Sequence, residues 1–155
     1  MEMFIKKAEL ADSQLVYNLT KAAFKAYDDP SLFPTTPALL ESKDDIIKDI
    51  KDKEILIAYL DNNAVGTVRY YGQGEDFYLI RLGVLPEYQG YEIGKKLILE
   101  VEERVRAEGG RRIILYSPSR LMNLINFYKD LDYQVIEIRE DEDYTRAKLA
   151  KIIDS

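Results

Sequence analysis

Runs of apolar and polar positions along the chain predict a series of short strands. Alternating or compact apolar stretches bounded by turn-forming residues are typical of strands buried on one or both faces. The pattern indicates strands at residues 4–8, 54–60, 64–71, 76–85, 112–116, 133–138 and 144–152. The last segment also has the Ala, Lys and Leu content of a helix, but its position after a strand and a turn favours a hairpin partner.

Four other segments show helical spacing of apolar residues. The first is expected to begin at Asp12 or Ser13 and the second at Ser42, the third to cover residues 91–108, and the fourth to run from Pro118 or Ser119 to Asp130. Between the first two helices, Pro30, Pro34 and Pro37 argue against a regular element. The order of elements predicts one mixed α/β domain over residues 1–155, with a meander of antiparallel strands at 54–85.

The amino-acid composition excludes several kinds of functional site. The chain has no histidine and no cysteine, which excludes Ser-His and Cys-His nucleophile pairs and the usual zinc sites, so no metal is expected. A net charge of −6 argues against a nucleic-acid reader, because such proteins need a basic face. No apolar run is long enough to cross a bilayer, so no membrane role is expected and a cytoplasmic location is the default.

The segment from Pro86 to Lys95 carries the clearest functional signal. An apolar strand ends there, and Gly90 and Gly94 precede or open the long third helix. The first N–H groups of a helix lack partners within the helix, carry partial positive charge and bind phosphate groups well. Lys95 and Lys96 add positive charge. We expect a diphosphate-bearing cofactor here; the alternative is a plain loop with a packing contact.

Gly83 is a second signal. A glycine inside an apolar strand indicates a bulge or a close approach of another backbone. A bulge would separate this strand from the strand at 112–116, and the exposed backbone groups would then pair with an extended ligand that contains amides. A glycine tolerated only for packing is the competing interpretation.

These residues together resemble the GNAT superfamily of acyl-CoA-dependent N-acetyltransferases. The likeness is strongest over RLGVLPEYQGYEIGKKLILEVEERVRAEGG and continues through IILYSP and NFYKDLDYQVIE. The resemblance implies a central, mostly antiparallel, twisted sheet that splays between the fourth and fifth strands and is flanked by about four helices. It also implies acetyl-CoA as co-substrate, an amine of a small molecule or peptide as acceptor, and leaves a homodimer open.

The resemblance assigns roles residue by residue. The family motif Q/R-x-x-G-x-G/A corresponds to residues 89–94, whose backbone amides would bind the CoA diphosphate, and residues 82–84 would pair with the pantetheine arm. Tyr128 stands where the family has a tyrosine that protonates the leaving thiolate; the alternative is a packed aromatic residue. The expected cofactor-binding residues are Leu82, Gly83, Val84, Gln89, Gly90, Tyr91, Glu92, Ile93, Gly94, Lys95 and Asn123.

Three positions depart from the family pattern. Glu92 replaces the first glycine of the motif, and a carboxylate near a diphosphate is unfavourable unless it faces water. Leu121 stands where many members have an asparagine that holds pantetheine, so Asn123 or Ser119 is expected to substitute for it. Asp132 replaces a glycine that precedes an aromatic residue.

The acceptor side is less defined by sequence. A general base would have to be a carboxylate, a tyrosine or a water chain. The candidates on the acceptor side are Glu75, Asp76, Tyr70, Tyr71, Tyr78 and Arg81, and the favoured alternative for each is a solvated or packed residue. The segment 27–42, with Tyr27 and Phe33, is expected to cover the acceptor pocket or to be a surface connection. Because a free amine attacks a thioester directly, no protein nucleophile is required. The leading hypothesis is therefore an N-acetyltransferase; the alternatives are a non-catalytic CoA-binding module and a structural domain without a cofactor.

Overall fold

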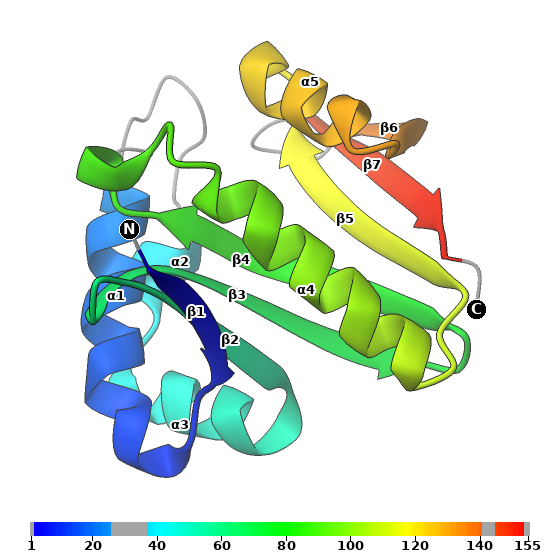
Figure 1. Cartoon of the computed structure of the whole chain (residues 1–155). Coiled ribbons are helices and arrows are strands. Elements are labelled where there is room, and N and C mark those ends of the chain that lie inside the picture. Colours follow the sequence, from blue (N-terminus) through cyan, green and yellow to red (C-terminus); the bar gives the residue numbers. More distant parts are fainter. Residues whose placement is uncertain (1, 26–36, 141–144, 154–155) are drawn as a thin grey trace.

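The computed structural model describes residues 2–25, 37–140 and 145–153, which form one mixed sheet with helices on both faces (Figure 1). The strands are β1 (Met3–Lys7), β2 (Glu54–Leu60), β3 (Asn63–Gln73), β4 (Asp76–Val84), β5 (Arg112–Pro118), β6 (Gln134–Glu140) and β7 (Thr145–Ile152). The helices are α1 (Ser13–Phe24), α2 (Pro37–Leu40), α3 (Lys43–Asp52), α4 (Ile93–Ala107) and α5 (Met122–Asp130). None of the helices within these residues is long and apolar enough to cross a membrane.

The sheet follows the order β1-β2-β3-β4-β5-β7-β6. Every neighbouring pair is antiparallel except β4 and β5, which run parallel. The first four strands form the predicted meander, and the turn between β2 and β3 has positive φ at both Asp61 (49°) and Asn62 (70°), as a tight hairpin turn requires. The strand interpretation of residues 144–152 is confirmed for the described part of that segment, which pairs with both β5 and β6.

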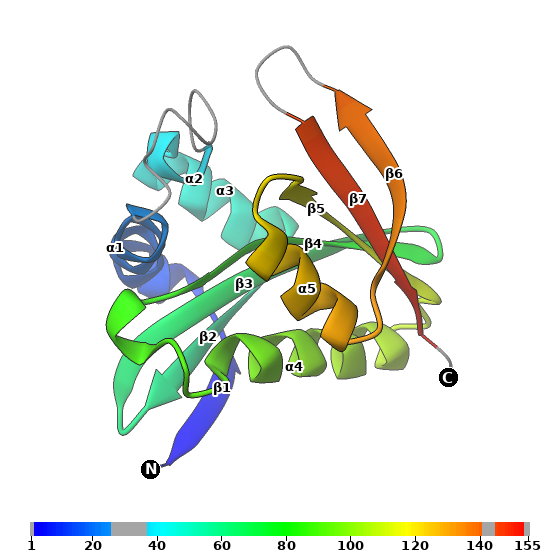
Figure 2. The same cartoon turned by 90° about the horizontal axis from the view of Figure 1, so that it is seen from above.

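Two hydrophobic layers hold the helices to the sheet. On one face α4 and α5 pack against the sheet, and on the other face α1 and α3 do so, as the view from above shows (Figure 2). β2 explains the arrangement, because Leu56 and Ala58 belong to the first layer while Ile55 and Ile57 belong to the second. A strand buried on both faces reads as a continuous apolar run, which is the pattern at these positions.

Two local predictions were wrong. Residues 37–40 form the short helix α2 although Pro37 had argued against a regular element, because proline is tolerated in the first turn, where its missing N–H has no partner to lose. The fourth helix begins at Met122 instead of Pro118 or Ser119, because β5 continues to Pro118 and pairs there with Arg146 of β7. Pro30 and Pro34 lie outside the described residues.

Candidate functional site

The parallel strands β4 and β5 separate part-way along their length. Their recorded pairs within the described residues are Asp76–Arg112, Phe77–Ile113 and Tyr78–Ile114. Beyond that point β4 remains paired with β3, and β5 remains paired with β7, so the two facing edges diverge (Figure 1). The splay predicted between the fourth and fifth strands is therefore present.

A bulge lies in β4 at the opening. Thr67 pairs with Gly83 and Arg69 pairs with Ile80, so Arg81 and Leu82 together oppose one residue of β3. Arg81 has a φ of 54°, which is rare for a residue with a side chain and is typical of a bulge position. The bulge predicted near Gly83 is present, but the strained residue is Arg81.

Gly83 itself has a different reason to be glycine. A Cβ atom at this position would lie 2.7 Å from the Phe24 ring and 3.0 Å from the Cβ of Ala23, both on α1. Helix α1 therefore approaches β4 more closely than any residue with a side chain would permit. The sequence suggested a bulge or a close approach here, and both are present: the bulge lies at Arg81 and Leu82, and the close approach lies at Gly83.

The start of α4 presents a row of backbone N–H groups. The first helical hydrogen bond recorded runs from the Lys96 N–H to the Glu92 carbonyl oxygen, at 3.1 Å. The N–H groups of Ile93, Gly94 and Lys95 precede it, and no acceptor is recorded for them among the described residues. No side chain caps this end either. These are the groups that an anion satisfies at a helix N-terminus.

A groove of about 910 Å³ runs along this helix start, between β4 and α5. Ten of the eleven predicted cofactor-binding residues line it: Leu82, Gly83, Val84, Gln89, Gly90, Glu92, Ile93, Gly94, Lys95 and Asn123. Tyr91 does not; it is exposed, and its ring lies 6.3 Å from that of Tyr88. Ser119, the other proposed asparagine substitute, donates its hydroxyl to the Thr145 carbonyl oxygen at 3.1 Å. Of the two, only Asn123 borders the groove.

Two of the three departures from the family pattern, Glu92 and Asp132, have a common backbone explanation. Glu92 has a φ of 60° and Asp132 has a φ of 73°, so both occupy the left-handed region that glycine adopts without strain. Glu92 is exposed on the rim of the groove, whereas Asp132 ends α5 on the surface. Leu121, the third departure, lines the groove with an apolar side chain.

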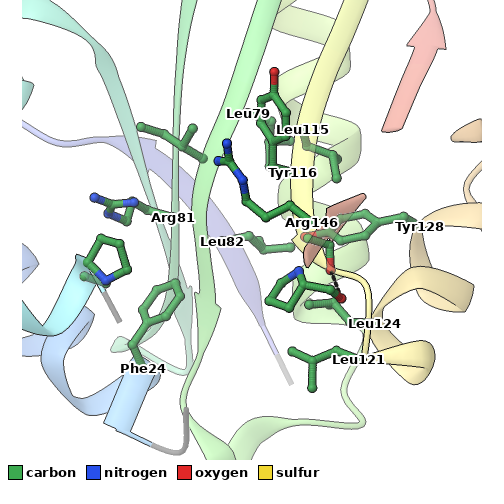
Figure 3. Close-up of a pocket in the computed structure, with 15 residues that line it drawn as sticks. Phe24, Leu79, Arg81, Leu82, Leu115, Tyr116, Leu121, Leu124, Tyr128 and Arg146 are labelled. Atoms are coloured by element: carbon green, nitrogen blue, oxygen red, sulfur yellow. Dashed lines mark hydrogen bonds between the residues drawn. The ribbon is translucent and has the colours of Figure 1, made fainter. Parts of the chain in front are cut away.

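A second cavity, of about 280 Å³, occupies the opening between β4 and β5 itself. Leu82, Leu121 and Leu124 line both spaces, so the cavity and the groove adjoin each other. Tyr128 borders the cavity: its ring projects from α5 toward β5 (Figure 3). That ring is buried and packs edge-on against Phe127 and Tyr133, at centroid distances of 5.3 Å and 6.1 Å.

Most of the candidate acceptor residues lie elsewhere. Asp76 is bound by Arg112 at the closed end of the splay, where this pairing lowers the pKa of the carboxyl group. Tyr70 is buried and donates to Glu108, and burial raises the pKa of its hydroxyl well above the ordinary value. Tyr71 stacks on Tyr78 at 5.3 Å, and neither borders the cavity.

Only Arg81 of that set lines the cavity. The described part of the segment 27–42 also contributes, through Pro37 and Ala38, while Tyr27 and Phe33 lie outside the described residues. Tyr116 of β5 and Arg146 of β7 line the same space, although no sequence pattern indicated them. The guanidinium of Arg146 lies 4.7 Å from the centre of the Tyr116 ring. The pairing of β5 with β7 brings these two residues together, so no local sequence pattern could predict that they are neighbours.

A buried ionic cluster supports this wall. Arg69, fully buried on β3, donates to both carboxylate oxygens of Glu41, at 2.8 Å and 2.9 Å, and to Asp49 at 2.8 Å. Arg81 Nε reaches the same Glu41 carboxylate at 3.4 Å. Lys21 Nζ bonds the carbonyl oxygens of Ala38, Leu39 and Glu41, and thereby ties α2 to α1. The cavity wall formed by α2 is thus anchored to the sheet.

Comparison with known proteins agrees with this geometry. The model of the acetyltransferase (GNAT) family matches residues 15–133. No protein of curated function matches the sequence. Among solved structures, PaiA N-acetyltransferase from Thermoplasma acidophilum in complex with coenzyme A is similar, with a TM-score of 0.81, 22% identity, and coverage of 98% of this chain and 99% of that one.

Two further structures show the same fold. An N-acetyltransferase from Staphylococcus aureus has a TM-score of 0.79 at 12% identity, covering 99% of this chain and 100% of its own. YncA from Salmonella typhimurium, a putative acetyltransferase with acetyl-CoA as its cofactor, has a TM-score of 0.78 at 14% identity, covering 100% and 96%. These identities support the fold alone. With the family model covering most of the chain, they lead to one conclusion: the chain belongs to the GNAT family of acetyltransferases.

Proposed function

We propose that this protein transfers an acetyl group from acetyl-CoA to a primary amine of a small molecule or peptide. The observation that carries the proposal is that the groove at the start of α4 adjoins the cavity between β4 and β5, since both are lined by Leu82, Leu121 and Leu124. Helix amides with no recorded acceptor among the described residues lie at the groove, and the buried Tyr128 borders the cavity.

The groove has the properties that coenzyme A requires. The amides at the start of α4 and the cation of Lys95 suit a diphosphate. The diverging edge of β4 at Leu82 to Val84 suits an extended arm that contains amide groups, which would add to the sheet as a further strand. Structural neighbours that hold coenzyme A or acetyl-CoA support this assignment.

The bound thioester supplies a carbonyl carbon that an amine attacks, so that an N–C bond forms and the C–S bond breaks. The chain holds the two reactants close together between β4 and β5, which lowers the barrier by several kcal/mol without a protein nucleophile. The Val84 amide is our candidate donor to the oxygen on which negative charge develops. We assign to Tyr128, which borders the cavity, the donation of a proton to the departing sulfur; the attacking nitrogen loses a proton to solvent, and Tyr128 regains one from solvent.

A CoA-binding module without catalysis is the second candidate. Glu92 at the rim and Leu121 in the groove favour it, because both replace residues that contact the cofactor in the family. Isothermal calorimetry with acetyl-CoA and thiol release over an amine panel separate the two candidates. Binding with turnover supports the transferase, binding without turnover on any amine supports the module, and an absence of binding contradicts both.

Three further properties belong to the same proposal. We treat residues 1–155 as a single catalytic domain and place the protein in the cytoplasm, where a chain without cysteine needs no oxidising compartment. The homodimer that the family likeness leaves open is tested by sedimentation in the presence of acetyl-CoA. A monomer at working concentrations would remove the homodimer and would leave the catalytic proposal unchanged.

A further inference from the structure

The acceptor end of the cavity is lined by cations. Arg81 enters from β4 and Arg146 from β7, and Figure 3 shows the Arg146 side chain extending toward β4. The polar remainder of the wall comes from Tyr116, Ser117 and Tyr128. Among the described residues that line the cavity there is no aspartate or glutamate. This is an unexpected surface for a protein whose net charge is −6.

Among the described residues, the carboxylates near Arg81 do not cancel its charge. Glu41 makes its short bonds to Arg69, at 2.8 Å and 2.9 Å, and reaches Arg81 only at 3.4 Å and only through Nε. Asp49 is already shared between Arg69 and Lys53, at 2.8 Å and 2.7 Å. The cluster therefore joins Arg69, Arg81 and Lys53 to Glu41 and Asp49, and one positive charge remains.

The remaining charge is directed at the cavity. The Arg81 side chain is 27% exposed, whereas that of Arg69 is fully buried. No hydrogen bond is recorded from the two terminal nitrogens of Arg81 within the described part of the chain. Those two nitrogens together can bind a carboxylate in a bidentate manner. Holding Arg81 at a φ of 54° has a conformational cost, which is common where a side chain must be aimed at a ligand.

We propose that the acceptor amine also carries a carboxylate, which Arg81 and Arg146 bind while its amine lies near Tyr128. This inference rests on the proposed acetyl transfer and names the substrate class: amino acids or the carboxyl-terminal part of a short peptide. Tyr116 and Phe24 provide apolar surface for a side chain between the two ends. Polyamines and other dications are excluded as good acceptors by like-charge repulsion.

The test compares each amino acid with its own carboxamide, at pH values chosen to give equal fractions of neutral amine, with a diamine as a third acceptor. We expect kcat/KM for the acid to exceed that for the amide by about tenfold or more, as one charge-assisted contact implies. Equal or better use of the amide or the diamine would overturn the proposal.

Variants of the two cavity arginines test whether they cause the preference for the acid over the amide. In Arg81→Gln and in Arg146→Gln the preference for acid over amide should fall by about tenfold, with the KM for acetyl-CoA unchanged. Arg111→Gln is the matched control, because Arg111 is exposed next to the other end of β5, away from the cavity. A preference that survives both cavity variants would contradict the assignment of these two residues. Purely structural damage would lower both rates without altering their ratio.

A binding experiment keeps this inference separate from acetyl transfer. An N-acetylated amino acid and its carboxamide differ at the carboxylate and need no reactive amine. Calorimetry on the CoA-loaded protein should show tighter binding of the acid, even if no amine is turned over. Tighter binding with no turnover would remove the proposed reaction and retain the anion site, whereas equal binding of the two compounds would remove the anion site.

Discussion

The groove at the start of α4 and the cavity between β4 and β5 are built in different ways. The groove presents backbone groups: the N–H groups of Ile93, Gly94 and Lys95 and the edge of β4. The cavity presents side chains from six separate elements, among them Arg81, Tyr116, Tyr128 and Arg146. Backbone geometry survives most substitutions, whereas a side-chain surface changes with each one.

Because of this difference, the groove and the cavity suit different kinds of ligand. A ligand shared by a whole family is best held by backbone dipoles, because they do not depend on residue identity. A ligand particular to one member has to be selected by side chains, which can be exchanged without disturbing the fold. We therefore expect substitutions in the groove to change the affinity for the cofactor, by blocking its approach to the backbone or by altering backbone strain. Substitutions in the cavity should instead change the turnover rate and the choice of acceptor.

The largest effect is expected in the cavity, for Tyr128→Phe. Loss of the hydroxyl removes the proposed proton donor to the leaving sulfur, so kcat should fall by about 100-fold or more. The ring packing against Phe127 and Tyr133 is kept, so acetyl-CoA affinity and thermal stability should stay unchanged. Stopped-flow thiol release measures the rate, with Tyr71→Phe, which stacks on Tyr78 away from the cavity, as the control. Undiminished turnover would remove Tyr128 as the acid.

The next largest effect is expected in the groove, for Gly94→Val. A Cβ atom at Gly94 would lie 3.5 Å from the Phe127 ring and 3.8 Å from Val84 Cγ2, which is ordinary contact, so the fold should tolerate it. The added methyl groups would instead occupy the space that a diphosphate needs. Affinity for acetyl-CoA should fall by about tenfold or more, as calorimetry would show. Ala107→Val, at the exposed far end of the same helix, is the control, and unaltered affinity in Gly94→Val would place the cofactor elsewhere.

A smaller effect of opposite sign is expected for Glu92→Gly. Glycine relieves the left-handed conformation, which costs a residue with a side chain about 1 kcal/mol, and it removes a carboxylate from the rim of the groove. Both the free energy of unfolding and the affinity for acetyl-CoA should rise, the affinity by about fivefold.

Asp132→Gly is the matched control for that change. Asp132 has the same left-handed conformation but does not border the groove, so its replacement should raise the free energy of unfolding by a similar amount and leave affinity unchanged. Denaturant titration and calorimetry on both variants provide the comparison. A gain in affinity in both, or in neither, would show that the charge of Glu92 has no specific influence on the cofactor.

The smallest effect concerns the closed end of the splay, where Arg112 binds Asp76. Hydrogen bonds from Arg112 lower the pKa of Asp76, so this carboxylate stabilises the fold above its unfolded pKa of about 4, and that contribution is lost as pH falls through the lower, folded value. Because both side chains are about one-third exposed (36% and 35%), screening keeps the contribution below about 1 kcal/mol. Asp76→Asn should therefore reduce stability at pH 7 and make no difference near pH 2; equal stability of the two proteins at pH 7 would contradict this.

Local sequence patterns predicted most of the fold, because the formation of strands and helices depends largely on residues that are close together in the chain. The period of apolar residues located the strands and the main helices, and the family likeness then supplied the splay. Boundaries were less certain: Pro37 opens a helix, and β5 extends to Pro118 because β7 offers pairing partners that no local pattern reveals. Gly83 was recognised as unusual, yet the distance to Phe24 that requires glycine exists only in the folded chain.

The sequence by itself determined the glycine-containing helix start, the absence of histidine and cysteine chemistry, and the position of Tyr128 in the chain, because each depends on residue type or on neighbours in the chain. The tertiary structure alone decided which side chains line the cavity. Arg81, Arg146 and Glu41 are far apart in sequence, and sheet pairing together with packing of α2 brings them together. Long-range contacts of this kind depend on how the whole chain buries its apolar surface, which no short segment encodes.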